Sequence, residues 1–144
     1  MRARDVMTTA VVAVPPTLRL AQLEDALIAR HIGGAPVVEG GRLVGIVSRS
    51  DVLRYFSIRR ALLSIMGHRS EGPHASEEAH LTVRDVMTRA PVVVAPEATI
   101  EEVAGLMAAR HVHRVIVTEG EAVVGLISAL DIAKLLADGH LRPV

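Results

Sequence analysis

The stretch Gly45-Ile46-Val47-Ser48-Arg49-Ser50-Asp51 decides the fold, because it recurs 80 residues later as Gly125-Leu126-Ile127-Ser128-Ala129-Leu130-Asp131. In each copy an apolar run that contains one glycine meets a serine, and an aspartate follows three residues after the serine. Helical spacing of apolar residues begins after the aspartate, so the stretch predicts a strand, a tight turn and a helix start. Backbone N–H groups and side-chain oxygens converge at such a corner, which suits a ligand with an anionic end and a diol.

The repetition extends over most of the chain. Residues 4–54 align with residues 84–134 without a gap, and 19 of the 51 aligned positions are identical. The opening Arg4-Asp5-Val6-Met7-Thr8, for example, recurs as Arg84-Asp85-Val86-Met87-Thr88. A module of this size is marginally stable alone, so we expect the two copies to bury surface against each other.

Each copy is predicted to fold in the order β-α-β-β-α. Short β-branched runs that end at proline predict strands over residues 11–14 and 92–94. The helix that follows in the second copy opens with a capping box of Thr99 and Glu102, whereas the first copy has Arg19 at the capping position. Two apolar runs around a Glu-Gly turn then predict a hairpin, with strands over 35–38 and 43–48 in the first copy and over 114–117 and 123–128 in the second.

A closing helix is predicted to open at Asp51 in the first copy and at Asp131 in the second, where Gly139 is a plausible C-cap. The first closing helix continues through the apolar stretch from Tyr55 to Met66, which either extends the core or forms a dimer or partner surface. The expected organisation is a first repeat with its extended helix over 1–66, a linker over 67–82, a second repeat over 83–140 and a tail over 141–144. Gly45 and Gly125 are expected to permit close backbone approach within their strands.

The composition excludes several classes of function. The 16 basic and 16 acidic residues cancel, so no net field attracts nucleic acid or an anionic membrane. Tyr55 and Phe56 are the only aromatic residues, too few for a surface that stacks bases. No apolar run approaches the ~18 residues of a membrane span, so we expect a soluble, cytoplasmic protein. The histidines His68, His74 and His80 are too loosely spaced for a metal site, and none is expected.

The duplication, the element order, the opening Asp-Val-Met-Thr, the Pro-Val-Val strand and the Gly-Ile-Val-Ser-x-x-Asp signature together resemble the CBS domain, paired in tandem as a Bateman module. The resemblance implies an α+β fold in which two β-α-β-β-α repeats pack about a pseudo-twofold axis with two clefts between them. It also implies an adenosine-containing ligand such as AMP, ADP, ATP or S-adenosylmethionine, and frequent assembly into a homodimer. Such modules usually regulate another protein and carry out no chemistry, so no cofactor is required.

The resemblance also implies the residues of two clefts. In the first, Asp51 accepts hydrogen bonds from the ribose hydroxyls beside Ser48, and the basic pair His113 and Arg114 contacts phosphate. The complete first set is Thr8, Ala10, Val12, Ala35, Pro36, Ser48, Arg49, Ser50, Asp51, His113 and Arg114. The second cleft is expected to be weaker, because Ala129 and Leu130 replace Arg49 and Ser50, and it comprises Thr88, Ala90, Val92, Val115, Ile116, Ser128 and Asp131.

Simpler roles remain open for these residues. The aspartates could be helix N-terminal carboxylates, worth about 0.3–1 kcal/mol each, and the serines could cap the same turn. The aliphatic residues could be plain core. At the level of function, the alternative to a nucleotide sensor is a structural dimerisation or protein-interaction module with vestigial clefts. An enzyme is not expected, because no nucleophile–base pairing, phosphate-binding loop or metal cluster is evident, and the regulated partner is unknown.

Overall fold

The computed structural model of the chain describes residues 1–67 and 79–141. The chain forms two compact units, each assembled from separate segments of the sequence. Unit 1 comprises Met1–Val11, Gly41–Leu43 and Pro91–Val144, and unit 2 comprises Val12–Gly40 and Val44–Ala90. Among the described residues, no helix is both long and apolar enough to cross a membrane.

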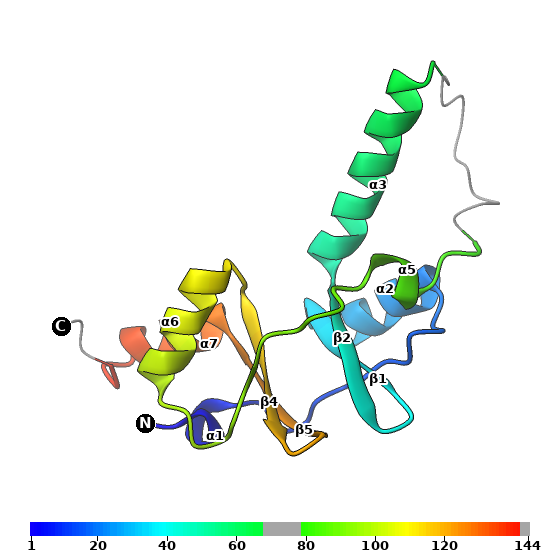
Figure 1. The fold of residues 1–144 in the computed structure, drawn as a ribbon. Coiled ribbons are helices and arrows are strands. Elements are labelled where there is room, and N and C mark those ends of the chain that lie inside the picture. Colours follow the sequence, from blue (N-terminus) through cyan, green and yellow to red (C-terminus); the bar gives the residue numbers. More distant parts are fainter. Residues whose placement is uncertain (68–78, 142–144) are drawn as a thin grey trace. The chain divides into compact units, whose positions relative to one another are not determined.

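Unit 2 packs helices against a two-stranded sheet (Figure 1). Its elements are α2 (Leu20–Ala29), β1 (Gly34–Glu39), β2 (Arg42–Ser48, whose first two residues group with unit 1), α3 (Arg49–Ile65) and α5 (Val83–Val86). Gly40 and Gly41, both with positive φ, join β1 to β2. The core includes Leu23, Val37 and Val47, all fully buried, together with Val83 from the start of the second repeat.

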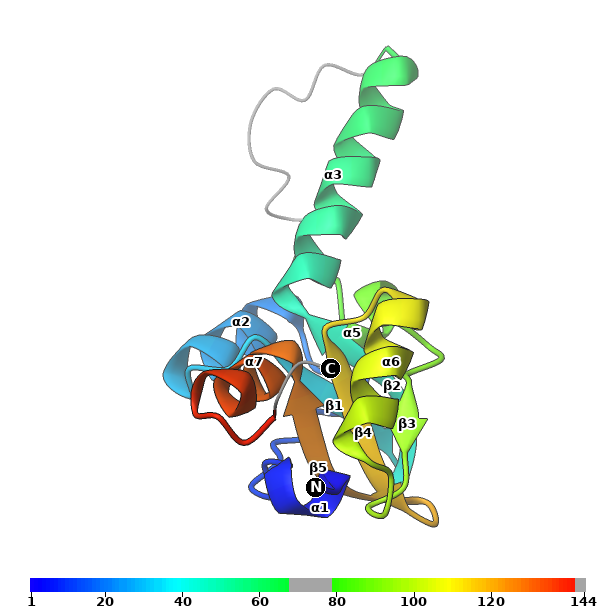
Figure 2. The same ribbon diagram turned by 90° about the vertical axis from the view of Figure 1, so that its left-hand side faces the viewer.

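Unit 1 has the same plan with one more strand. Its elements are α1 (Ala3–Val6), β3 (Val93–Val94), α6 (Ile100–Arg110), β4 (Arg114–Glu119), β5 (Ala122–Ser128) and α7 (Ala129–Ala137). β4 lies between β3, to which it is parallel, and β5, to which it is antiparallel. Ile127 and Val103 are fully buried in its core, as is Ala3 from the start of the first repeat. Ala3 belongs to α1, which lies beside β5 (Figure 2).

The two repeats therefore exchange their opening segments. The backbone of Thr8 exchanges hydrogen bonds with Leu126 at 2.9 and 3.1 Å, and Thr88 does the same with Ile46 at 2.8 and 3.0 Å. Each opening segment thus pairs antiparallel with the second hairpin strand of the other repeat. For this reason the compact units do not coincide with the predicted segments 1–66 and 83–140.

The glycine of each signature stretch makes the exchange possible. A Cβ on Gly45 would lie 2.7 Å from the carbonyl oxygen of Thr88, and one on Gly125 would collide with the side chain of Met7. Only a residue without a side chain permits this approach. The predicted close backbone approach is confirmed at Gly45, whereas at Gly125 the neighbour is the Met7 side chain.

Most predicted elements are present, with two differences. The predicted strand over 11–14 is reduced to one parallel bridge between Val14 and Val37, because the prolines that follow it cannot donate to a ladder. The closing helices begin at Arg49 and Ala129, two residues before the aspartates, since Ser48 and Ser128 are the N-caps. The predicted linker falls largely on residues 68–78, which lie outside the described residues.

Candidate functional site

The corner between β2 and α3 is fixed by a capping box. The Oδ2 atom of Asp51 accepts hydrogen bonds from the backbone N–H of Ser48 at 2.8 Å and from its hydroxyl at 2.9 Å. The Ser48 hydroxyl in turn accepts from the backbone N–H of Asp51 at 3.3 Å. These bonds satisfy orphan donors of the first helical turn and hold the carboxylate in one orientation.

The second oxygen of Asp51 has weaker partners. Its Oδ1 atom lies 3.5 Å from the hydroxyl of Thr88 and 3.5 Å from the guanidinium of Arg54. Both distances are at the limit of a hydrogen bond. The Asp51 side chain is only 11% exposed, whereas Arg54 is 66% exposed. The Asp51 side chain is therefore largely shielded, and the contacts that Thr88 and Arg54 make with its Oδ1 atom are long.

The corner between β5 and α7 repeats the capping box. Asp131 Oδ2 accepts from the N–H of Ser128 at 2.8 Å and from its hydroxyl at 2.7 Å. The Asp131 N–H returns a bond to the Ser128 hydroxyl at 3.2 Å. Within residues 1–67 and 79–141, no threonine or arginine reaches the Oδ1 atom of Asp131 as Thr88 and Arg54 reach that of Asp51. The polar setting of the two carboxylates is thus unequal.

The predicted cleft residues are distributed over both compact units. Unit 2 holds Val12, Ala35, Pro36, Ser48, Arg49, Ser50, Asp51, Thr88 and Ala90, and unit 1 holds Thr8, Ala10, Val92, His113, Arg114, Val115, Ile116, Ser128 and Asp131. Thr88, which the sequence grouped with Asp131, is beside Asp51, and Thr8 lies in the unit of Asp131. The reason is the exchange of opening segments. An approach of His113 and Arg114 to Asp51 stays a prediction.

Three of the aliphatic candidates are buried. Ala35 is 1% exposed, and Val115 and Ile116 are fully buried. Ala35 and Val115 belong to the two core clusters. Ala35 and Val115 therefore pack in the cores of their units, the simpler role that the sequence left open for them, whereas Ile116 belongs to neither cluster. A ligand role for the three residues stays a prediction.

Sequence reasoning did not single out Arg54. Its position three residues after Asp51 is a signal for proximity, because residues three apart on a helix lie on the same face. Lys134 stands at the equivalent position after Asp131. Arg54 is therefore a candidate to affect the affinity of the Asp51 carboxylate for a ligand.

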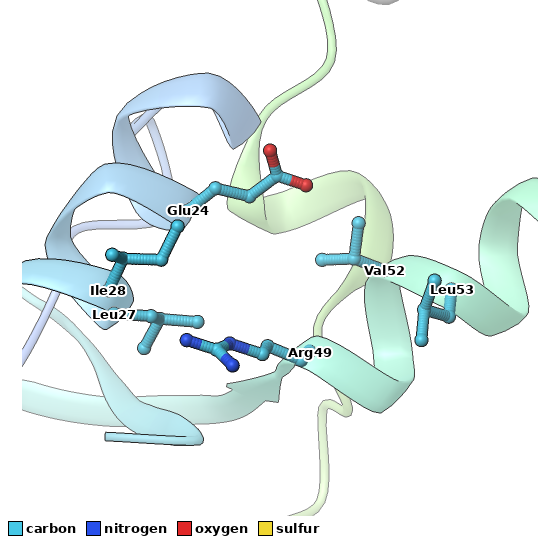
Figure 3. Close-up of a pocket in the computed structure, with 6 residues that line it drawn as sticks. All are labelled: Glu24, Leu27, Ile28, Arg49, Val52 and Leu53. Atoms are coloured by element: carbon cyan, nitrogen blue, oxygen red, sulfur yellow. The ribbon is translucent and has the colours of Figure 1, made fainter. Parts of the chain in front are cut away.

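A pocket of about 300 Å³ lies between α2 and α3 (Figure 3). Buried Leu27 and Val52 form part of its wall, and exposed Ile28 and Leu53 stand at its edge. Its remaining lining residues, Glu24 and Arg49, bring charges of opposite sign. Figure 3 shows the Arg49 guanidinium extending towards α2. This predicted cleft residue therefore lines a largely apolar pocket.

Comparison with known proteins places the chain in a family. The model of the CBS domain matches twice, over residues 3–58 and 83–138. An inosine-5'-monophosphate dehydrogenase of Korarchaeum cryptofilum is 30% identical over 132 residues, covering 91% of this chain and 23% of the dehydrogenase. The chain thus spans about a quarter of the length of that relative.

Solved structures show the same fold. The CBS domain pair of protein MJ0100, in complex with 5'-methylthioadenosine and S-adenosyl-L-methionine, superposes with a TM-score of 0.77 at 20% identity, covering 96% of this chain and 98% of the other. CBSX2 in complex with AMP gives a TM-score of 0.73 at 22% identity, covering 97% and 98%. Both repeats of the sequence are matched by the family model, and the α+β fold is that of CBS domain pairs. The chain belongs to the CBS domain family and carries two copies of the domain in tandem.

Proposed function

We propose that the chain is a regulatory module that binds an adenosine-containing ligand, with the Asp51 corner as its main ribose site. The single observation that carries the proposal is the state of the Asp51 carboxylate. Oδ2 is occupied by the capping box, whereas the partners of Oδ1 among the described residues are Thr88 and Arg54, each at 3.5 Å. A ribose hydroxyl would give Oδ1 a shorter, charge-assisted hydrogen bond.

The capping box limits how the ribose can bind. An ionised carboxylate offers about two acceptor sites on each oxygen. Two donors from Ser48 already fill the acceptor sites of Oδ2. A ribose must therefore place both hydroxyls on Oδ1, or place one on Oδ1 and the other on the Thr88 hydroxyl. The Thr88 hydroxyl both donates and accepts, which allows it to bond a second ribose hydroxyl.

Other parts of the ligand are assigned by analogy with the family. His113 and Arg114 are proposed to contact phosphate, which suits the planar donor fork of arginine. Adenine is proposed to lie against aliphatic side chains and backbone groups, because the chain has two aromatic residues in all. The two similar structures solved with AMP, and with S-adenosylmethionine and methylthioadenosine, support this class of ligand for those proteins and motivate the choice here.

Regulation requires more than binding. A ligand changes the behaviour of the module only if it binds two conformations with different affinity. We propose that occupancy is passed to a protein partner that is yet to be identified, and that the module works as a homodimer. No catalytic step is proposed.

The test compares Asp51→Ala with Asp131→Ala. Both variants lose the same capping box and are expected to lose similar stability, about 1 kcal/mol each. AMP, ADP, ATP, S-adenosylmethionine and methylthioadenosine are titrated by calorimetry into the wild type and both variants. We expect the preferred ligand to bind at least tenfold more weakly to Asp51→Ala than to the wild type. Its affinity for Asp131→Ala should change less.

The wild type provides the control for ligand choice. A ligand at about 100 times its Kd adds about 2.7 kcal/mol to the stability of the folded state, which a thermal shift detects. If none of the five compounds shifts the wild type, the sensing proposal fails, and the interaction module with vestigial clefts replaces it. Equal losses in both variants would instead remove the special role of Asp51.

A further inference from the structure

Arg54 is the cation that the structure brings to the Asp51 carboxylate. Both residues belong to α3 and lie within unit 2, and the Arg54 guanidinium is 3.5 Å from Asp51 Oδ1. The Arg54 side chain is largely exposed, so water screens this ion pair and the guanidinium is held weakly. Arg49, on the first turn of the same helix, extends its guanidinium towards α2 instead (Figure 3). Arg54 is therefore the arginine that places positive charge beside the oxygen proposed to bind ribose.

The position of Arg54 on the helix keeps its charge near the corner when a ligand binds. A ribose hydroxyl on Oδ1 replaces a guanidinium contact that is at the limit of a hydrogen bond. The guanidinium then moves by rotation of its own side chain, because its backbone is fixed on the same face of α3 as Asp51. It therefore stays near the groups that the ligand carries beyond the ribose.

The candidate ligands differ in the charge that they carry beyond the ribose. AMP, ADP and ATP have phosphate at the 5' carbon, methylthioadenosine has an uncharged thioether there, and S-adenosylmethionine has a sulfonium cation. All of them present the same adenine and the same pair of ribose hydroxyls. A contact between Asp51 and the ribose alone does not distinguish them, whereas charge beside the corner does.

We propose that Arg54 is a specificity-determining residue, which makes the Asp51 corner select adenosine ligands with an anionic 5' group over neutral or sulfonium ones. This inference rests on the proposed ribose site at Asp51. Without Arg54, the Asp51 carboxylate would repel a phosphate bound beside it and attract a sulfonium. With Arg54 nearby, the carboxylate binds the ribose and its negative charge is compensated. The guanidinium also offers phosphate oxygens a planar fork of donors.

The size of the effect follows from distance and screening. Taking roughly 8 Å between the Arg54 guanidinium and the 5' group of a bound ligand, one pair of unit charges changes an equilibrium constant by roughly 2- to 30-fold, depending on how far water screens the pair. Because the Arg54 side chain is largely exposed, we expect a change near the lower end of this range, about three- to fivefold at physiological salt.

The test compares AMP with methylthioadenosine, because the two share the adenine and the ribose hydroxyls and differ in 5' charge. Both are titrated by calorimetry into the wild type and into Arg54→Gln, which removes the charge and keeps a polar side chain. We expect Arg54→Gln to weaken AMP about three- to fivefold. Methylthioadenosine should bind as before or slightly tighter, because Oδ1 loses a competing donor. Arg54→Lys keeps the charge and should restore most of the preference for AMP.

Two control variants separate a local effect of Arg54 from a change in total charge. Arg60→Gln removes another exposed arginine from the same helix, and Lys134→Gln removes the cation at the equivalent position of the other repeat. Neither is expected to change the ratio of the affinities for AMP and methylthioadenosine. This ratio is also insensitive to a loss of folded protein, which affects both ligands equally.

The outcomes separate this inference from the proposed function. If Arg54→Gln weakens both ligands equally, or leaves their affinity ratio at the wild-type value, the specificity proposal is overturned and the ribose site stands. A wild type that binds methylthioadenosine more tightly than AMP would also overturn it. If neither compound binds the wild type, the proposed ribose site fails, and the role of Arg54 fails with it.

Discussion

The Ser48–Asp51 corner of unit 2 and the Ser128–Asp131 corner of unit 1 share one capping box, but they differ in what faces the second carboxylate oxygen. In both corners the serine N–H lies 2.8 Å from Oδ2, and the hydroxyl distances are 2.9 and 2.7 Å. Only Asp51 also has Thr88 and Arg54 near Oδ1 among the described residues.

This difference separates two roles of one aspartate. The bonds to Oδ2 are needed wherever this strand turns into this helix, since they satisfy donors of the first helical turn. The surroundings of Oδ1 are not needed for that purpose, because unit 1 forms its corner although no threonine or arginine of the described residues contacts Asp131 Oδ1. The residues around Oδ1 can therefore be adapted to a ligand without weakening the capping box that the fold needs.

The largest expected effect concerns the two glycines that admit the exchanged segments. Gly45→Ala and Gly125→Ala should each lower the free energy of unfolding by about 1–3 kcal/mol, as overpacking does. The obstacle at Gly45 includes the Thr88 carbonyl oxygen at 2.7 Å, which belongs to the backbone, whereas the obstacle at Gly125 is the Met7 side chain. Shortening the methionine should therefore relieve Gly125→Ala more.

Double-mutant cycles in urea measure this asymmetry. Gly125→Ala is combined with Met7→Ala, and Gly45→Ala is combined with Met87→Ala as the matched pair. We expect a favourable coupling energy in the first cycle and a smaller one in the second, because the Thr88 carbonyl stays in place. Equal coupling energies would show that the two exchanged segments pack equivalently.

A smaller effect is expected at the two exchanged threonines. Thr88→Val removes the hydroxyl beside Asp51 and should weaken the preferred ligand by roughly 0.5–1.5 kcal/mol, the net worth of one hydrogen bond. Thr8→Val, at the equivalent position in the other unit, should leave the affinity of the Asp51 corner unchanged. Calorimetry on both variants and on their combinations with Asp51→Ala is the measurement.

The sequence grouping of residues makes the opposite prediction, so this experiment decides between them. If Thr8 acts with Asp51, then Thr8→Val and Asp51→Ala are non-additive and Thr88→Val has no effect. Non-additivity of Thr88→Val with Asp51→Ala would support the structural grouping.

Local features of the fold could be predicted from the sequence because their causes are local. The hairpin turns follow from Glu-Gly pairs, and Gly40 and Gly120 do have positive φ. The Thr99 capping box is present, with the Thr99 hydroxyl accepting from the Glu102 N–H at 3.2 Å. The extension of the first closing helix to Ile65 follows from its uninterrupted helical pattern.

The exchange of opening segments could not be predicted from pattern alone. Residues 4–8 and 84–88 have the same sequence, so no local signal says which hairpin each segment joins. The choice depends on burial over long range, such as the packing of Val83 in unit 2 and of Ala3 in unit 1. The same ambiguity affects the grouping of cleft residues: Thr88 lies beside Asp51, whereas the prediction that Thr8 belongs to the cleft of Asp51 stays a prediction.

The smallest expected effect concerns the helix that follows the exchanged segment in each repeat. The N-cap of α6 is Thr99, whose hydroxyl accepts a backbone N–H, whereas the N-cap of α2 is Arg19, which supplies no such acceptor. The Arg19 backbone N–H donates to Gln22 Oε1 at 3.3 Å, but the Arg19 side chain makes no capping hydrogen bond. Arg19→Thr should therefore stabilise the protein by about 0.5–1 kcal/mol, by adding the acceptor and removing a cation from the helix N-terminus.

Thermal unfolding in low and high salt separates these two contributions. Arg19→Ala removes the cation without adding an acceptor, so it should gain less than Arg19→Thr at low salt and almost nothing at high salt. Thr99→Ala should lose about 1 kcal/mol, since it deletes the bond that Arg19→Thr adds to the other repeat. If Arg19→Thr and Arg19→Ala gain equally at every salt concentration, the backbone bond to Gln22 already suffices to start α2, and the two repeats begin their helices by different means with equal stability.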